Sequence, residues 1–302
     1  MTLSKTQKFI EDDFFKPLYE KYKGLMEETP EKVININGVE RKRTKELLHK
    51  EFEKVLSIVN NKFPVYLSGP AGTGKTTIAS KIADTLDLEF YMNIKLTDVF
   101  ELIGFIDAKG SYVETEFYKA FTQGGLYFID EIDSSDPSVL VAINAAIANR
   151  KMVFPNGTVD AHEKFCIIVA GNTNGSGANE NYNTRNLIDA ATLDRFIILN
   201  IDYDERIEKE VAGGDGNIVK LVNKLRTIDT PFRSVFSTRF IQKFVLLKNQ
   251  GFSKEEITKV LFTDYDTYYK DEVDKLVDAA LKSKKSGQKT EKPTTLSEIF
   301  DI

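Results

Sequence analysis

Residues 69–76 read Gly69-Pro70-Ala71-Gly72-Thr73-Gly74-Lys75-Thr76 and fit the pattern Gly-x-x-x-x-Gly-Lys-Ser/Thr. They follow the apolar run Val65-Tyr66-Leu67 and precede a helical pattern over Thr76–Thr85, so this loop joins a strand to a helix. Glycines let successive backbone N–H groups curl around phosphate oxygens, and the helix N-terminus adds the positive end of its dipole. The segment predicts a nucleoside triphosphate site made by residues 69–76 and Thr77, with Lys75 reaching the β- and γ-phosphates.

A second chemical pattern is the apolar run Leu126-Tyr127-Phe128-Ile129, which ends in the two carboxylates Asp130 and Glu131. Open α/β sheets bind ligands at the carboxyl ends of their strands. We expect Asp130 to hold Mg²⁺ together with the Thr76 hydroxyl, and Glu131 to polarise a water that attacks the γ-phosphate. The alternative is that Glu131 only faces solvent.

A third polar segment, Gly171-Asn172-Thr173-Asn174, follows the apolar run Cys166–Ala170. If that run is a neighbouring strand, Asn172 lies at the same edge of the sheet and can orient the attacking water. An ordinary turn rich in Asn and Gly is the competing interpretation.

The chain around these motifs alternates strands with helices, which is typical of a parallel sheet with crossover helices. Further strands are expected at Leu88–Met92 and Phe196–Leu199, and helices at Glu114–Phe121 and Pro137–Asn149. The run Met152–Val159 predicts a hairpin that turns at Asn156-Gly157. We therefore assign residues 46–203 to one α/β nucleotide-binding domain.

The two ends of the chain differ from this domain. Residues 1–45 predict an extension made of a helix over residues 1–30 and a hairpin over Lys32–Glu40, and a helix is expected from Thr44 to Asn60. Residues 204–282 predict a small helical domain, and residues 283–302 a disordered tail. The helices expected in the helical domain span Asn217–Arg226, Ser237–Leu247, Lys254–Leu261 and Asp264–Leu281.

Composition narrows the class of protein. The 302 residues include 41 Lys and Arg against 46 Asp and Glu, for a net charge of −5, which argues against a dedicated nucleic-acid coat protein. The sequence contains no apolar run of about 18 residues, so no membrane span is expected. A single cysteine, Cys166, with the distant His49 and His162, excludes a disulfide within the chain and a Cys- or His-rich metal site. We expect a soluble protein of the reducing cytoplasm.

Together these motifs resemble the AAA+ ATPases over about residues 45–245. The nearest group is the MoxR and dynein-related one, which includes the ATPase subunit of cobaltochelatase and similar proteins common in phage genomes. The most specific matches are Asp107–Thr115, Gly124-Gly125 and Asp189–Phe196. The resemblance implies an α/β fold, a P-loop NTPase with a three-layer parallel sheet (the AAA+ core), followed by a small C-terminal all-helical lid domain.

The resemblance also implies roles for particular residues. Asn172 matches the first sensor, and Arg195 the arginine finger that completes a neighbouring subunit's site. Arg239 matches the second-sensor arginine, and Arg185 another contact between subunits; for both, an ordinary surface arginine is the alternative.

Two insertions resemble those of the same group. The Phe105–Glu114 segment, with Tyr112 near its tip, and the Met152–Val159 hairpin are expected to project toward the pore or one face of a ring. For Phe105 and Tyr112, the alternative is simple packing on the domain.

The resemblance implies a Mg²⁺-dependent enzyme that binds and hydrolyses ATP in a homo-oligomeric ring, with a hexamer favoured, and that remodels a protein client or adaptor. A partner with a von Willebrand A-type domain and a bacterial or phage-infected host cell are also implied. A nucleic-acid-associated motor or loader is the alternative, favoured by Arg41-Lys42-Arg43 and the Lys-rich tail. A nucleotide-binding protein without turnover is a third class, and the presence of Glu131 and Asn172 argues against it.

Overall fold

The computed structural model describes residues 32–36, 39–44, 46–179, 182–227, 235–262 and 270–282. The helix expected over residues 1–30 and the tail expected over residues 283–302 lie outside the described residues. The chain divides into two units, Met1–Glu46 and Leu47–Ile302. In the first unit, β1 (Lys32–Ile36) and β2 (Val39–Thr44) pair as an antiparallel hairpin, so the expected hairpin is confirmed.

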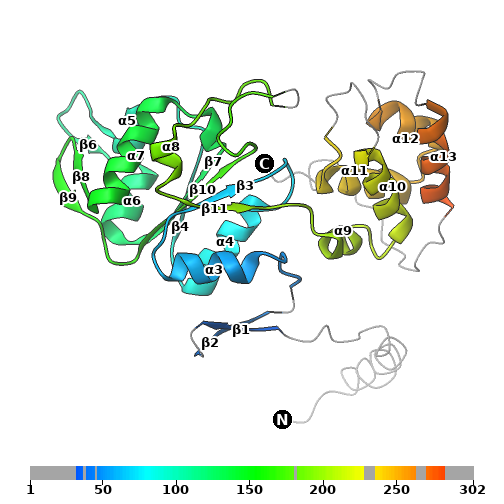
Figure 1. Ribbon diagram of the computed structural model, residues 1–302, viewed down its shortest axis with the longest axis horizontal. Coiled ribbons are helices and arrows are strands. Elements are labelled where there is room, and N and C mark those ends of the chain that lie inside the picture. The colour runs from blue at the N-terminus through cyan, green and yellow to red at the C-terminus, as the bar shows by residue number, and fades with distance from the viewer. Residues whose placement is uncertain are drawn as a thin grey trace, which may run out of the picture. The chain divides into compact units, whose positions relative to one another are not determined.

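The second unit contains a five-stranded sheet with the order β11-β3-β10-β7-β4, in which all neighbouring strands are parallel (Figure 1). Its strands, in chain order, are β3 (Val65–Ser68), β4 (Phe90–Ile94), β7 (Gly125–Asp130), β10 (Phe165–Gly171) and β11 (Ile197–Asn200). The strands expected from the apolar runs are therefore confirmed, although β4 begins at Phe90 rather than Leu88. Strands β3, β7 and β10 are almost wholly buried, because a parallel sheet is covered on both faces.

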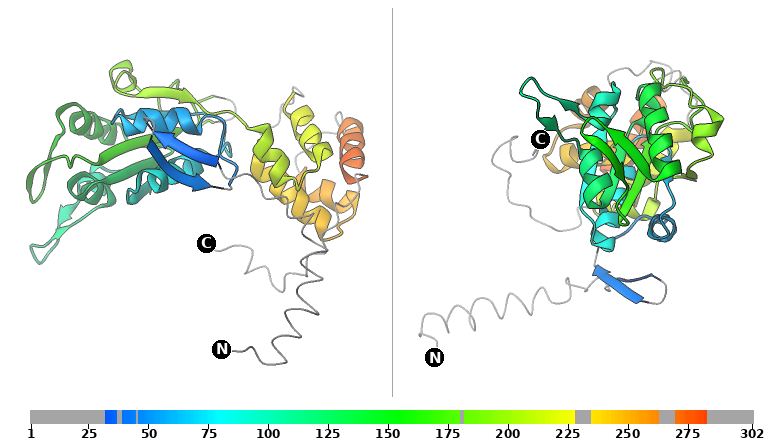
Figure 2. Two further views of the ribbon diagram at one scale, coloured as in Figure 1. Left: turned by 90° about the horizontal axis from the view of Figure 1, so that it is seen from below. Right: turned by 90° about the vertical axis from the view of Figure 1, so that its left-hand side faces the viewer.

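Helices cover the two faces of this sheet and complete three layers (Figures 1 and 2). On one face, α3 (Phe52–Asn60) and α4 (Lys75–Leu86) contact each other and the sheet. On the other face, α6 (Glu116–Gln123) contacts β4, β7 and β10. The remaining helices of the domain are α5 (Val99–Ile103), the 3₁₀ helix η2 (Ile132–Ser134), α7 (Pro137–Asn149) and α8 (Ala190–Leu193). The α/β class and the three-layer architecture with a parallel sheet expected from sequence are confirmed.

Local signals explain where α7 begins and ends. The Asp136 side chain accepts a hydrogen bond from the Ser138 backbone N–H at 2.8 Å, and Pro137 occupies the first helical turn. After the helix, Arg150 adopts a left-handed conformation, and the hairpin of β8 (Lys151–Phe154) and β9 (Gly157–Asp160) follows. The predicted helix and the predicted hairpin with its turn are both confirmed.

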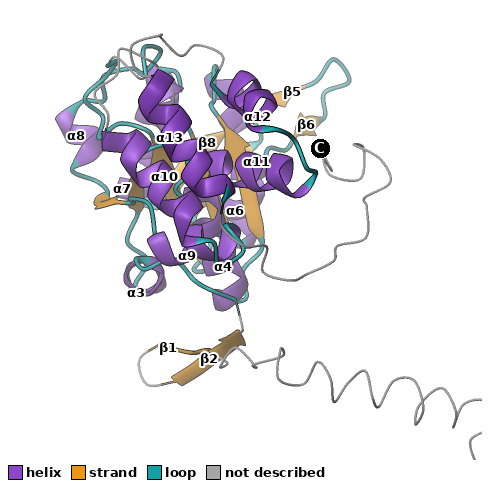
Figure 3. Ribbon diagram, turned by 90° about the vertical axis from the view of Figure 1, so that its right-hand side faces the viewer, coloured by secondary structure: helices purple, strands orange, loops and turns teal. Residues whose placement is uncertain are grey.

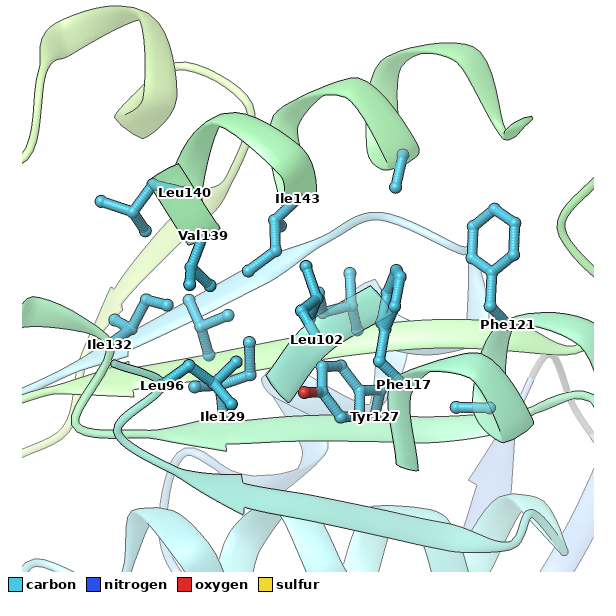
Figure 4. Packing of buried hydrophobic residues seen from close by; sticks show 14 of the residues in the cluster. Leu96, Leu102, Phe117, Phe121, Tyr127, Ile129, Ile132, Val139, Leu140 and Ile143 are labelled. Carbon is cyan, nitrogen blue, oxygen red and sulfur yellow. The ribbon is translucent and has the colours of Figure 1, made fainter. Parts of the chain in front are cut away.

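An aromatic cluster fills the space between the sheet and α6 and α7 (Figure 4). Phe117 is fully buried at its centre. Its ring centroid lies 5.4 Å from that of Phe121, 5.2 Å from Tyr127, 6.0 Å from Phe154 and 6.0 Å from Phe165. These separations are in the range preferred by aromatic pairs, so the cluster fixes α6 against β7 and β10.

The described residues after β11 form helices and no strand, as Figure 3 shows in purple. These helices are α9 (Glu205–Val211), α10 (Gly216–Thr227), α11 (Thr238–Asn249), α12 (Lys254–Leu261) and α13 (Lys270–Leu281). They enclose a second apolar core around Val222, Phe244 and Ile257, each fully buried. The helices expected from the 3.6-residue period are confirmed, except that the first part of the helix expected at Asp264–Leu281 lies outside the described residues.

Some expected boundaries and positions are wrong. The helix expected from Thr44 begins only at Phe52, because Thr44 pairs with Lys32 at the end of the hairpin. Short helices α5 and α9 were not expected, since neither is long enough to show a clear period.

Tyr112 also lies elsewhere than expected. The two-residue strands β5 (Phe105–Ile106) and β6 (Tyr112–Val113) pair, so Tyr112 stands at the base of the insertion rather than at its tip. Its hydroxyl donates to the carbonyl of Ile103 at 2.7 Å, and its ring packs edge-on against Tyr118. Phe105 remains 48% exposed, so packing on the domain describes Tyr112 but not Phe105.

Phe117→Ala should lower the free energy of unfolding by about 3–5 kcal/mol, because it removes a ring from the centre of the cluster and leaves a cavity. Phe100→Ala is the matched control, since Phe100 is 56% exposed and its removal should cost less than about 0.5 kcal/mol. Urea titration followed by circular dichroism measures both. Equal losses for the two variants would show that the cluster does not support the domain.

Candidate functional site

The candidate site lies at one edge of the sheet, where three adjacent strands end. β3 leads into the Gly69–Thr76 loop, β7 ends at Asp130, and β10 ends just before Asn172. In the sheet, β10 lies between β3 and β7, so the three segments predicted separately from sequence come together. Parallel strands bring their carboxyl ends to the same edge, which is where open α/β sheets bind ligands.

Two glycines of the loop are required by close contacts. A Cβ atom at Gly69 would lie 2.0 Å from the carbonyl oxygen of Ile201, the residue that follows β11. A Cβ atom at Gly72 would lie 2.6 Å from Cβ of Ser237. Both glycines have positive φ angles, 153° and 76°, which other residues rarely adopt. The loop path therefore depends on these positions having no side chain.

Lys75 is the buried cation of the site, with 6% of its surface exposed. Its Nζ atom donates hydrogen bonds to the carbonyl oxygens of Gly69 at 2.7 Å and Pro70 at 2.9 Å, and to Oδ1 of Asn172 at 3.1 Å. Burial lowers the pKa of Lys75 to about 8, although Asp130 and Asp133 act in the opposite direction. Lys75 and Asn172, predicted from separate motifs, are therefore in direct contact.

Thr76 and Asp130 form the second contact between predicted residues. The Thr76 hydroxyl donates to Oδ2 of Asp130 at 2.9 Å. Mg²⁺ bound with nucleotide prefers oxygen ligands and takes only one or two of them from the protein, the rest from phosphates and water. In the part of the chain that the structure describes, no group of three or more His, Cys, Asp or Glu residues could hold a metal by itself. This hydroxyl and carboxylate thus fit a Mg²⁺ ion that arrives with nucleotide.

Glu131 has a strained backbone and a paired side chain. Its φ and ψ angles, 55° and 39°, lie in the left-handed region, and its N–H donates to Oδ1 of Asp130 at 3.0 Å. Arg185 donates to both carboxylate oxygens of Glu131, at 3.2 Å and 3.3 Å, and also to the Ser134 hydroxyl. Arg185 is thus bound to its own chain's Glu131 and has 9% of its side chain exposed. Arg185 is therefore not the ordinary surface arginine of the alternative, and its contact with another subunit stays a prediction.

Asp133 was not predicted, and it connects the ends of β7 and β10. The residue is fully buried. Its Oδ2 atom accepts hydrogen bonds from the backbone N–H groups of Asn172 at 2.9 Å and Thr173 at 3.0 Å, and from the Thr173 hydroxyl at 3.0 Å. Its Oδ1 atom is buried and has no hydrogen-bond partner among the described residues, a condition that costs about 1–3 kcal/mol.

Two tyrosines at the loop were also not predicted. The Tyr182 hydroxyl accepts a hydrogen bond from the Ala71 N–H at 3.0 Å, and the Tyr203 hydroxyl donates to the Ala71 carbonyl at 3.1 Å. Neither tyrosine belongs to a motif, and only the fold brings them to Ala71. The segment between Asn172 and the Asp189–Phe196 run therefore contributes Tyr182 and Arg185 to the site.

The two remaining predicted arginines are both exposed. Arg239 lies beside the loop, because a Cβ atom at Gly72 would be 3.8 Å from its Cγ atom, and its charge contributes to the lowered pKa of Lys75. Arg195 follows α8 and donates to the carbonyl of Ala191. Among the described residues, no hydrogen bond or ion pair joins Arg195 to the site of its own chain. The last predicted loop residue, Thr77, is exposed on the first turn of α4.

The chain has the AAA+ P-loop NTPase fold. Residues 64–196 form the segment that matches the family model described as the AAA domain of the dynein-related subfamily. It spans β3 to Phe196 and contains the loop, both carboxylates of the β7 end, Asn172 and Arg195.

Several similar proteins are known. An uncharacterized protein of Staphylococcus aureus (strain USA300) is 24% identical over 212 residues, which cover 65% of this chain and 73% of that protein. Proteins of other Staphylococcus aureus strains, NCTC 8325 and MRSA252 among them, match equally.

Solved structures are similar at lower identity. NtrX from Brucella abortus has a TM-score of 0.47 and 12% identity over 66% of this chain and 50% of its own. The RuvB Holliday junction branch migration motor of Thermotoga maritima has a TM-score of 0.44 and 19% identity over 76% of this chain and 68% of its own. The match thus spans half the length of the NtrX chain.

Among the described residues, no helix combines the length and the apolar character needed to span a bilayer.

Gly69→Ala should disrupt the loop, because the new methyl group would meet a backbone oxygen that cannot move aside. Gly214→Ala is the matched control: Gly214 also has a positive φ angle, 82°, but a Cβ atom there meets nothing within 4 Å. We expect Gly69→Ala to lose at least about 2 kcal/mol more of unfolding free energy than the control, measured by urea titration. Equal stability of the two variants would mean that the contact with Ile201 does not constrain the loop.

Proposed function

We propose that this chain binds and hydrolyses ATP with Mg²⁺. The observation that carries the proposal is the hydrogen bond between the Thr76 hydroxyl and Asp130, which joins the two sequence motifs at one point beside Lys75. Asn172 contacts Lys75, and Glu131 follows Asp130 directly, so the residue types needed for phosphate binding, metal binding and water activation share one edge of the sheet.

In this proposal each residue has a defined task. The N–H groups of the Gly69–Thr76 loop and the Lys75 ammonium bind the β- and γ-phosphates, for which Lys75 exchanges its carbonyl partners for phosphate oxygens. Thr76 and Asp130 hold Mg²⁺, which when bound supplies positive charge at the phosphate oxygens. Glu131 accepts a proton from the attacking water, and Asn172 orients that water. Arg239 adds positive charge at the phosphates.

We further propose that the active form is a homo-oligomeric ring of the MoxR type, with a hexamer favoured, in which Arg195 completes the neighbouring site. Its exposure supports this role, because a residue that acts on another subunit must be accessible. The exposed apolar side chains of the two insertions, Phe105, Ile106 and Val153, support contact with a protein client or an adaptor of the von Willebrand A type. The alternative, a nucleic-acid-associated motor or loader, is favoured by the basic residues Arg41-Lys42-Arg43 of β2.

ATP affinity should fall as the pH rises above about 8. The free Lys75 ammonium has a pKa of about 8, and bound phosphates raise that pKa, so ATP binding takes up a proton above this pH. The affinity is therefore nearly constant below pH 7 and falls about tenfold between pH 7 and pH 9, measured with a fluorescent ATP analogue. Lys75→Arg, which stays charged, should bind more weakly but with the same affinity at both pH values. A wild-type affinity that does not change between these pH values would contradict the role of Lys75.

Two inactive variants should restore activity when mixed. Glu131→Gln should bind ATP without hydrolysing it, and Arg195→Ala should bind ATP with little turnover because the neighbouring site lacks its arginine. In rings formed from equal amounts of both chains, a site is complete when an Arg195→Ala chain neighbours a Glu131→Gln chain. About a quarter of wild-type phosphate release should therefore return.

The matched control for this mixing experiment is a chain with both substitutions combined with the Arg195→Ala chain. That mixture has no site with both groups and should stay inactive. Activity in Arg195→Ala alone, or no recovery in the mixture of single variants, would contradict the ring model.

A further inference from the structure

Arg185 forms ion pairs with two carboxylates but donates hydrogen bonds to only one of them. Its Nη1 atom lies 3.2 Å from Oε2 of Glu131 and 3.6 Å from Oδ1 of Asp133. Nη2 donates to the second oxygen of Glu131 at 3.3 Å. The guanidinium is therefore paired with Glu131 through two nitrogens, while Asp133 is within reach but just beyond hydrogen-bond distance.

Buried atoms of Asp133 and Arg185 that form no hydrogen bond indicate that the Arg185 guanidinium has a second possible position. Among the described residues, Oδ1 of Asp133 and Nε of Arg185 are buried and have no hydrogen-bond partner. Asp133 cannot turn toward solvent, because its Oδ2 atom holds three hydrogen bonds from Asn172 and Thr173. A small shift of Arg185 toward Asp133 would turn the ion pair at 3.6 Å into a hydrogen bond to a buried carboxylate oxygen that now has none.

The contact with Glu131 conflicts with the task assigned to that residue. Both oxygens of Glu131 accept hydrogen bonds from a guanidinium, and such charge-assisted bonds are strong. A carboxylate with both oxygens engaged by a guanidinium has fewer lone pairs left for a water. Arg185 and the attacking water therefore compete for Glu131, and release of one oxygen by Arg185 favours hydrolysis.

We propose that Arg185 is a positioning residue of the ATPase site: it holds Glu131 before nucleotide binds and moves its guanidinium to Asp133 when ATP is bound. This inference rests on the proposed function, since it concerns the step in which Glu131 accepts a proton. Asp133 serves as the second acceptor, and the exchange leaves Arg185 paired in both states. Glu131, with 41% of its side chain exposed, is then free to turn toward the phosphates.

Tyr182 connects the loop with this exchange. Its hydroxyl accepts the Ala71 N–H, and its ring lies 5.9 Å from the guanidinium carbon of Arg185. A phosphate oxygen carries charge and is a stronger acceptor than a neutral hydroxyl, so it displaces Tyr182 from Ala71. Because Tyr182 also contacts Arg185, this displacement changes the surroundings of the guanidinium at the moment when ATP enters.

The test compares full-length variants by two measurements: affinity for a slowly hydrolysed ATP analogue, and the single-turnover rate of ATP hydrolysis with protein in excess. Arg185→Met removes the charge at similar length and should raise the rate at least about threefold, with analogue affinity within about twofold of wild type. Arg185→Lys, which keeps a charge but makes fewer bonds to Glu131, should lie between Arg185→Met and wild type. Arg150→Met is the control, because Arg150 is exposed and donates to the carbonyl of His162 away from the site; it should match wild type.

Asp133→Asn should have the opposite effect. The amide oxygen can keep the bonds from Asn172 and Thr173, but the amide nitrogen then faces Arg185 and cannot accept its hydrogen bond. Arg185 stays on Glu131, and the rate should fall about tenfold at unchanged analogue affinity. Tyr182→Phe should raise analogue affinity about two- to fivefold, because the Ala71 N–H no longer has a competing acceptor. If Asp133→Asn does not fold, as judged by circular dichroism, the two Arg185 variants decide the question.

The outcomes separate this inference from the proposed function. A wild-type chain that hydrolyses ATP, a Glu131→Gln chain that does not, and an Arg185→Met chain no faster than wild type would overturn the inference alone. Weaker analogue binding by Tyr182→Phe would overturn the link to the loop. If Glu131→Gln hydrolyses ATP as fast as wild type, the proposed function itself is wrong.

Discussion

The buried carboxylate of Asp133 is the contact on which the candidate site depends. One oxygen accepts three hydrogen bonds from Asn172 and Thr173, which joins the end of β10 to the turn that follows β7. This fixes the distance between Asn172 and Glu131, and Asn172 in turn holds Lys75. The other oxygen faces Arg185. A buried carboxylate without these partners would be strongly destabilising, so its position is tightly constrained by the surrounding groups.

The loop is connected to the helical part of the chain through Tyr203. Its hydroxyl bonds the Ala71 carbonyl, and the Arg226 guanidinium lies 3.5 Å from the centre of its ring. Arg226 also pairs with Glu208, which is 1% exposed, and donates to the carbonyl of Phe236. Phosphates bound by the loop therefore lie next to a segment held by Tyr203, and Tyr203 in turn contacts Arg226 of α10. This gives the proposed ATPase a physical connection from its nucleotide site to the helices that follow, as domain closure requires.

The sequence predicted the site residues that directly follow a strand along the chain. The Gly69–Thr76 loop, Asp130 and Asn172 follow apolar strands directly, and parallel pairing brings strand ends together, so their contacts could be expected before the structure was known. Asp133 could not be expected, because it stands in the polar run Asp133-Ser134-Ser135-Asp136, which is typical of an exposed turn. The only signal was its place two residues after Glu131. Arg185 was expected at a subunit contact, and nothing in its neighbours along the chain shows that it bonds Glu131. The roles of Asp133 and Arg185 depend on burial and on contacts between residues far apart in the chain, which a local sequence pattern does not predict.

The central claim is that this edge of the sheet hydrolyses ATP with a metal ion held by Thr76 and Asp130. The most direct measurement is the release of inorganic phosphate from ATP by the purified full-length chain, with Mg²⁺ and again after addition of EDTA. The account predicts release that requires Mg²⁺ and is lost with EDTA, while the secondary structure seen by circular dichroism is unchanged. Phosphate release at the same rate in EDTA, or none under either condition from a folded chain that binds ATP, would contradict it.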